Sequence, residues 1–382
     1  MVSTAKPRVS MRLDGRNASS PVVEREVESF CATYREDVRK LARTSPAVAD
    51  LAVSFPGLLF ALASGYGSLS ARERCLNAIN AGCSLRTAAE LVDVPYWLRR
   101  LPAEAFGVPL SRLEGSGEFN RRIVSHVPTE AWKATGWLNR VQLARDLVDE
   151  DFALWMAWRS KSMPRLRDIN RLVPLCAWAW FSKHPDTLGA LLLRQPYDPA
   201  IGLRKAADET DIWKRRLELA VSLGEGVRDT WYGPGCAGGY EFVPLAKFED
   251  FIAESEAMDN CLDQFAPQVQ QRNTRVFSVR KDGKPVADLE IAPHTEDPTM
   301  PSIEQLRGPA NRRAAAGVWQ AVYNWLSAQP ARTLPATRPH AGASRTVARR
   351  IWQPFLEAAK TTPGAATLRD YLKSNDVLDP EF

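Results

Sequence analysis

The first half of the chain has the three- and four-residue periodicity of amphipathic helices. Over residues 137–148 (WLNRVQLARDLV), apolar residues recur at this spacing between polar ones, which predicts a surface helix with one buried stripe. Short Pro and Gly interruptions divide residues 22–230 into about eight to ten such segments, so we expect a helical domain there. The tryptophan-rich stretches at 152–158 and 178–180 are expected to fill its core.

A glycine-rich segment at 231–240 interrupts this pattern. It contains the spacing GxGxxG at Gly233, Gly235 and Gly238, but Pro234 lies inside it and an extended stretch follows. A dinucleotide-binding loop requires a strand before the glycines and a helix after them. We therefore expect a linker rather than a phosphate-binding loop.

Residues 241–329 have the pattern of a small α+β domain. Apolar residues at helical spacing over 245–265 predict a helix, and two alternating runs at 275–280 and 285–291 flank a turn at 281–283, which predicts a β-hairpin. A third short strand over 302–307 and a helix over 311–329 complete the domain. The predicted fold is mainly α with a small α+β domain: an N-terminal multi-helix region, then a unit of helix, antiparallel hairpin, third strand and helix.

The register of the hairpin decides which side chains share a face. A three-residue loop with Gly283 in the left-handed conformation keeps the apolar residues together, whereas a two-residue loop would mix them with Asp288. We therefore expect one apolar face, formed by Phe277, Val279, Ala287, Leu289 and Ile291. The opposite face carries Arg280, Asp288 and Glu290.

The two ends of the chain and its apolar runs have simpler interpretations. Residues 1–21 are expected to form a disordered basic tail without a signal peptide, and residues 330–382 an Arg-rich linker followed by short helices. The most apolar run, 172–181, has about half the length that a membrane-spanning helix needs. We therefore expect no membrane span.

The cysteine pattern bears on location and cofactors. The chain has 6 cysteines with no CxxC pair and no Cys/His cluster at ligand spacing, so neither a zinc site nor a disulfide framework is expected. Reduced thiols are typical of the cytoplasm, which is the location that we expect. No cofactor or metal site is evident in the sequence.

Four runs of residues, in the same order along the chain, resemble the PcfJ-like domain. They are EFVPL at 241–245, AMDNCLDQF at 257–265, the hairpin at 275–291 and IEQLRGPAN at 303–311. This family is named for a protein of a conjugative plasmid, occurs widely in bacteria and their mobile elements, and has no established activity. The resemblance implies a bacterial or mobile-element origin for this chain. Many members of the family carry a histidine immediately before the cysteine, where this chain has Asn260.

Two enzymatic sites are candidates. In the first, Cys261 is a nucleophile and His294 its base, with Glu296 or Asp297 orienting the imidazole, because a thiol needs a neighbouring base or cation to become a thiolate. The structural alternative is a buried thiol on the apolar face of the helix and a solvated loop histidine.

The second candidate is the polar face of the hairpin. There Asp288 and Glu290 lie beside Arg280, and we expect Asn260, Arg307 and Asn311 nearby. Paired carboxylates beside Arg can perform acid and base chemistry or hold a divalent ion. The alternative is a solvated strand face with surface ion pairs.

Arginines point to a different class of function. Between Gln305 and Leu356 there is no acidic residue, and the stretch contains eight arginines: Arg307, Arg312, Arg313, Arg332, Arg338, Arg345, Arg349 and Arg350. Such a stretch favours phosphate binding. Residues 84–100 also have the letters of a helix-turn-helix, for which a plain helical hairpin is the alternative. The candidate binding residues are Asn260, Arg280, Arg307, Asn311, Arg312, Arg313, Arg349 and Arg350.

The sequence thus favours a cytoplasmic nucleic-acid-associated or adaptor protein whose partner is nucleic acid or another protein. The alternative is a cysteine- or carboxylate-dependent hydrolase or transferase with its site within 241–329. Whether the protein is an enzyme is left open.

Overall fold

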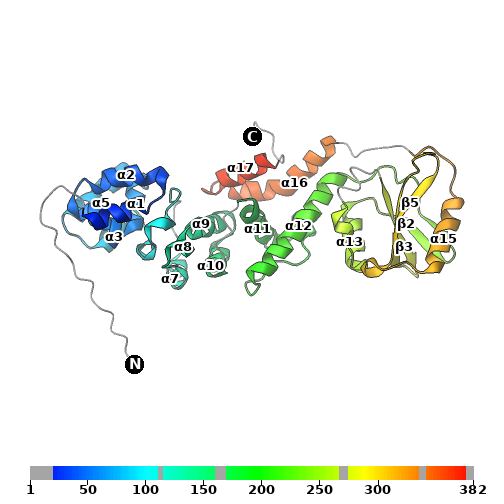
Figure 1. Ribbon diagram of the computed structural model, residues 1–382, viewed down its shortest axis with the longest axis horizontal. Helices are drawn as coiled ribbons and strands as arrows, with labels where there is room; N and C mark the ends of the chain where they lie inside the picture. The colour runs from blue at the N-terminus through cyan, green and yellow to red at the C-terminus, as the bar shows by residue number, and fades with distance from the viewer. Residues whose placement is uncertain (1–19, 111–114, 160–168, 266–273, 335–340, 376–382) are drawn as a thin grey trace, which may run out of the picture. The chain divides into compact units, whose positions relative to one another are not determined.

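A computed structural model describes residues 20–110, 115–159, 169–265, 274–334 and 341–375 (Figure 1). They form two compact units, one comprising residues up to Leu172 together with Thr361–Ala365, and the other comprising the rest. The division falls inside the region expected as one helical domain over 22–230. The tail expected over 1–21 lies outside the described residues, except for Ser20 and Pro21 at the start of the first helix.

The N-terminal unit is helical, as its periodicity predicted. Serine side chains cap several of its helices by accepting a hydrogen bond from a backbone N–H in the first turn, which satisfies a donor that has no partner within the helix. The helices are α1 (Pro21–Glu28), α2 (Ala32–Ala42), α3 (Pro46–Ser54), α4 (Pro56–Ala63), α5 (Leu69–Asn80), α6 (Leu85–Glu90), α7 (Gly117–Ile123), α8 (Ala131–Ala134), α9 (Trp137–Leu147) and α10 (Glu150–Arg159), with 3-10 turns η1 (Tyr96–Arg100), η2 (Ala103–Ala105) and η3 (Val124–His126).

Two details of this unit differ from expectation. Helix α9 forms where predicted, but most of its residues are buried, including Arg140 and Gln142, so it is a core helix and not a surface helix. In the tryptophan-rich stretch of α10, Phe152 and Trp155 are buried as expected, whereas Trp158 is 51% exposed. The apolar stripe of α10 ends one residue before Trp158.

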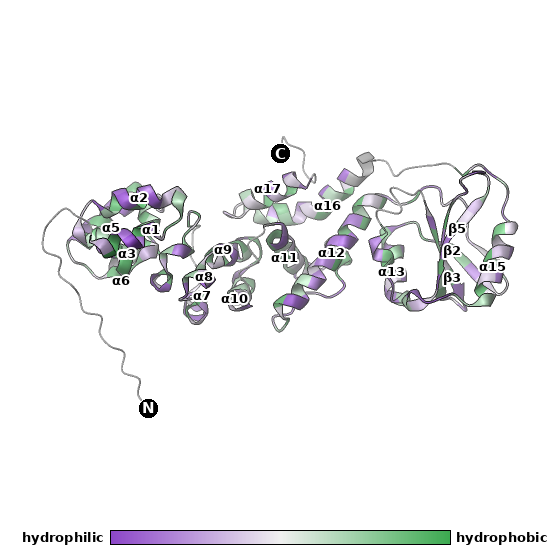
Figure 2. Cartoon of the chain, in the orientation of Figure 1, coloured by the Kyte–Doolittle hydropathy of each residue, from purple (hydrophilic) through white to green (hydrophobic). Residues whose placement is uncertain are grey.

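The second unit contains a helical part and a sheet. Its helical part consists of α11 (Ile169–Ser182), whose first turn belongs to the N-terminal unit, η5 (Ala190–Leu192), α12 (Leu203–Leu223), α16 (Ala341–Ala359) and α17 (Ala365–Ser374). In α12, hydrophobic and hydrophilic residues alternate along the helix (Figure 2). Its buried Trp213 packs edge-on against Trp352 of α16. Trp178 and Trp180 are buried, as the sequence predicted.

The sheet has five antiparallel strands in the order of the chain. They are β1 (Gly235–Ala237), β2 (Tyr240–Pro244), β3 (Arg275–Lys281), β4 (Lys284–Pro293) and β5 (Pro301–Arg307). The prediction of a linker at 231–240 is wrong, because this segment contains β1 and the turn into β2. Gly238 and Gly239 adopt positive φ angles of 59° and 77° in that turn, a conformation that glycine permits. The expected strand at 302–307 is confirmed.

The β3–β4 register places the five predicted apolar residues on one face. Phe277 pairs with Leu289 and Val279 with Ala287. The expected three-residue loop is wrong, because Asp282 and Gly283, both at positive φ, form a two-residue turn. A register shift next to Val279 restores the alternation, since a bulge inserts one unpaired residue.

Two helices cover the two faces of the sheet (Figure 1). On the apolar face lies α15 (Ala316–Ser327), whose Trp325 ring stacks on Phe242 at 4.5 Å and meets Phe277 edge-on at 4.9 Å. On the polar face lies α13 (Phe248–Met258), followed by η6 (Leu262–Gln264). The fold class, mainly α with a small α+β part, is confirmed. Within the described ranges, every helix is too short or too polar to cross a lipid bilayer.

Replacing Trp325 with Ala is expected to destabilise the sheet by about 3–5 kcal/mol, because the substitution removes a fully enclosed aromatic side chain and leaves a cavity. Hydrogen exchange of the β2–β4 amides measures this loss. Tyr323→Ala on the same helix is the control, since Tyr323 is 54% exposed and its loss should cost less than about 0.5 kcal/mol. Equal protection in the two variants would contradict this packing.

Candidate functional site

The polar face of the sheet is buried and not solvated. Asp288 and Glu290 point to the same side of β4 because they are two residues apart, and they are 6% and 3% exposed. Helix α13 covers this side and contributes Glu254, which is 2% exposed. The alternative of a water-exposed strand face with surface ion pairs is therefore wrong.

Glu254 and Asp288 form a buried carboxyl pair. Burial, and secondarily the neighbouring Glu254, raises the pKa of Asp288 to about 8. Asp288 Oδ1 and Glu254 Oε1 receive no hydrogen bond within the part of the chain that the structure describes. A proton held by Asp288 and directed at Glu254 satisfies both oxygens. Arg280 approaches Glu254 to 3.6 Å and offsets the remaining negative charge.

Asn260 fixes the turn after α13 to this pair. Its side-chain amide donates to Asp288 Oδ2, and its own Oδ1 accepts from the backbone N–H of Leu262. The turn forms because Asp259 adopts the left-handed conformation, with φ 50°, and the N–H of Asn260 bonds to the carbonyl of Ser255. The expected helix over 245–265 therefore ends at Met258.

Cys261 lies in this turn and is exposed, contrary to the alternative of a buried helical thiol. The side-chain amide of Asn311 lies 3.9 Å from its sulfur, at the limit of a weak hydrogen bond. Asn311 belongs to the short turn η7 (Pro309–Asn311), where Ala310 and Asn311 both have positive φ. The last helix of the domain for this reason begins at Ala316 and not near 311.

Arginines surround this turn. Arg307 lies opposite Asp288 in the β4–β5 register, and Arg312 and Arg313 follow in the exposed loop. The structure thus brings together residues from the turn after α13, from three strands and from η7: Asn260, Cys261, Arg280, Asp288, Glu290, Arg307 and Asn311.

His294 does not join them. It follows the far end of β4, six residues beyond Asp288, which is about 20 Å along a strand. Its ring nitrogen accepts from the backbone N–H of Glu296. The proposed Cys261–His294 pair is therefore not formed.

The Arg-rich stretch does not form one surface on the sheet domain. Arg349 and Arg350 lie on α16, which packs against α12. Arg332 pairs with Asp229 at 2.7 Å, and Arg338 lies outside the described residues.

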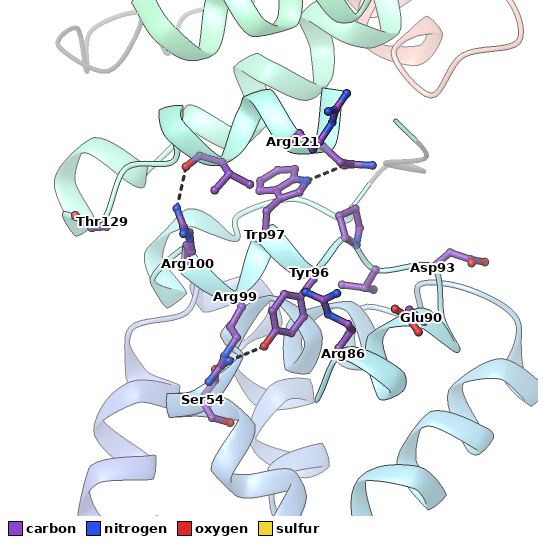
Figure 3. A pocket seen from close by; sticks show the side chains of 14 residues that line it. Ser54, Arg86, Glu90, Asp93, Tyr96, Trp97, Arg99, Arg100, Arg121 and Thr129 are labelled. Carbon is purple, nitrogen blue, oxygen red and sulfur yellow. Dashed lines mark hydrogen bonds between the residues drawn. The ribbon is translucent and has the colours of Figure 1, made fainter. Parts of the chain in front are cut away.

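A second candidate site lies in the N-terminal unit. It is a groove of about 1240 Å³ whose lining includes Arg86, Arg99, Arg100 and Arg121 (Figure 3). All four are exposed. Two carboxylates, Glu90 and Asp93, share the groove, so the arginines outnumber the acids two to one.

Hydrogen bonds hold two of these arginines in place. Arg99 donates to the carbonyl of Ser54 and to the hydroxyl of Tyr96, and Arg100 donates to the carbonyl of Val124. Arg86 lies over the Tyr96 ring, 5.0 Å from its centre. Within the described part of the chain, neither Arg86 nor Arg121 has an ion-pair partner. Both side chains are also exposed, so their guanidinium groups are accessible to a ligand.

The groove is built on the segment with helix-turn-helix letters. Helix α6 ends at Glu90, and the turn after it has Asp93 in the left-handed conformation, φ 54°, where the N–H of Val94 bonds to the carbonyl of Ala89. The expected second helix is wrong, since only the five-residue 3-10 turn η1 forms before Pro102. Sequence reasoning identified this segment but missed Arg121, which α7 supplies from a distant position in the chain.

Comparisons with protein-family models, curated proteins and solved structures found no match to this chain. The resemblance of residues 241–329 to the PcfJ-like domain therefore stays a prediction. Within the described residues, no group of three His, Cys, Asp or Glu side chains is placed to hold a metal ion.

The carboxyl pair predicts a pH-dependent stability. A carboxyl with a higher pKa in the folded protein than its ordinary value of 3.8 binds more protons when folded, so the free energy of unfolding falls as pH rises from about 4 to about 8. Asp288→Asn keeps the hydrogen bonds but does not titrate. The free energy of unfolding, measured with urea, should therefore fall less in the variant than in the wild type as pH rises from about 5 to about 9. The difference should exceed about 1 kcal/mol.

The matched control is Asp282→Asn, because Asp282 is an exposed carboxylate in the turn of the same hairpin. It should follow the wild type at both pH values. If Asp288→Asn also follows the wild type, the two carboxyl groups do not share a proton.

Proposed function

We propose that this protein binds nucleic acid through the arginine groove of its N-terminal unit. The observation that carries the proposal is the presence of four exposed guanidinium groups in one concave site. Guanidinium groups match phosphate oxygens in geometry and charge, and phosphate contacts supply most of the affinity in sequence-independent binding. Two of the four are already held by carbonyl oxygens, which lowers the entropy lost when a ligand binds.

We also propose that the protein acts in the cytoplasm and that residues 241–329 form a PcfJ-like domain. The cytoplasmic location is supported by six free cysteines. The family assignment is supported by the ordered motifs, which the fold brings into one domain. An adaptor role for this domain would use its exposed loop with Arg312 and Arg313 as the protein-binding surface.

The hydrolase alternative has weaker support. Cys261 is exposed, but His294 is distant and the carboxyl oxygens Asp288 Oδ1 and Glu254 Oε1 are enclosed. A general acid or base must reach the substrate to within a hydrogen bond or one water. In this arrangement the carboxyl pair supports the fold of the turn rather than a reaction.

The double variant Arg86→Gln, Arg121→Gln tests the proposed function. Neither arginine is needed for an internal ion pair in the described residues, so the fold should be retained. Binding to a fluorescein-labelled oligonucleotide should weaken at least about tenfold, and the salt dependence of log K should fall by about 0.7–0.9 per arginine.

Two controls accompany this variant. Arg204→Gln on α12 removes an exposed charge outside the groove and should bind as the wild type does. Arg312→Gln, Arg313→Gln removes the charges of the sheet domain. If this second pair weakens binding more than the groove pair does, the nucleic-acid site is on the sheet domain and the proposal is wrong.

A further inference from the structure

The turn η1 leaves little with which to read a base sequence in a duplex. A helix-turn-helix protein places a recognition helix in the major groove, where several of its side chains contact base edges. Here the corresponding element is five residues long, about 10 Å at the 3-10 rise. Trp97 and Leu98 are buried, and Tyr96 is held between Arg86 and Arg99. The groove therefore offers arginines for phosphate contacts but no recognition helix that could enter a major groove.

An exposed tryptophan follows a residue of this groove closely along the chain. Thr129 lines the groove, and Trp132 follows three residues later, at most about 10 Å along the chain. Trp132 is 56% exposed, although a tryptophan normally buries most of its surface.

An ion-paired lysine contacts the ring of Trp132. Lys133 lies over its ring, 4.9 Å from the centre, and forms an ion pair with Glu130. Because this lysine is paired with a carboxylate, the feature of Trp132 available to a ligand is its exposed surface, which leaves ring area open for stacking. An aromatic platform beside a positively charged groove is the arrangement that binds single strands, because unpaired bases stack on the ring while their phosphates contact the cations.

We propose that the groove takes single-stranded nucleic acid, with the phosphates on the four arginines and a base stacked on Trp132. This inference rests on the proposed function and adds the class of substrate. It makes Trp132 the residue that distinguishes a strand with bases from a bare phosphodiester chain. Stacking does not depend on which base is present, so binding is independent of sequence.

The test compares two probes of equal charge on the full chain. One is a fluorescein-labelled oligothymidylate of about 15 nucleotides, within the site sizes of such grooves, and the other is an abasic phosphodiester strand of the same length. The wild type should bind the oligothymidylate at least about fivefold more tightly than the abasic strand. Trp132→Ala should lose this difference and bind both probes as the wild type binds the abasic strand. An oligouridylate of the same length shows whether RNA is bound as well as DNA.

Trp158→Ala is the matched control. Trp158 is also exposed and also has a cation on its ring, Arg159 at 3.8 Å. Unlike Trp132, it is 29 residues along the chain from Thr129, the nearest residue in sequence that lines the groove. It should keep the preference for the oligothymidylate. Trp132→Phe should recover part of the preference, since it restores an aromatic face.

The outcomes separate the two proposals. If Trp132→Ala keeps the full preference, or if a duplex of the same length binds more tightly than the single strand, this inference is overturned while groove binding stands. If no probe binds at low salt, or if Arg86→Gln, Arg121→Gln changes nothing, the proposed function itself is overturned.

Discussion

Two aspartates in the left-handed conformation, Asp93 and Asp259, determine both candidate sites. Each lies in the turn that follows a helix, and the N–H of the next residue bonds back to a carbonyl five residues earlier, from Val94 to Ala89 and from Asn260 to Ser255. Glycine is the usual residue at this position, and aspartate tolerates it because its short polar side chain can bond locally. In the N-terminal unit the turn brings η1 to the edge of the arginine groove. In the second unit the turn directs Asn260 toward the sheet and leaves Cys261 at the surface.

The two sites use charge in opposite ways. On the sheet, carboxyl groups are enclosed, and the cost of burying them is met by a shared proton, the amide of Asn260 and the nearby Arg280. In the groove, guanidinium groups are exposed and partly held by carbonyl oxygens, so their charge is available to a ligand. Enclosed charge stabilises one arrangement of the turn, whereas exposed charge in a concave site attracts a partner.

Local pattern predicted the elements better than their ends. The apolar face of the hairpin was predictable because alternation specifies which residues share a face. This prediction is confirmed, although a bulge and a two-residue turn replace the expected loop. The ends of α13 and α15 were not predictable, since Asp259, Ala310 and Asn311 carry no glycine signal for a left-handed backbone. The glycines at 233–239 led to the wrong prediction of a linker. Glycine also permits a tight turn and a close approach of the backbone to Trp325, and this segment has both. Burial of Asp288 and Glu290 depends on α13 lying over the polar face, which no strand pattern contains. The groove could not be derived either, since it joins Arg121 to a segment more than 20 residues away.

Salt dependence of binding tests the central claim most directly. In a titration of the full chain with a labelled oligothymidylate over about 50–300 mM KCl, log K should fall linearly with log salt with a slope near −3, since four arginines each displace about 0.7 of a counterion from a single strand. A slope near zero, or no binding at the lowest salt, would contradict a phosphate-binding groove.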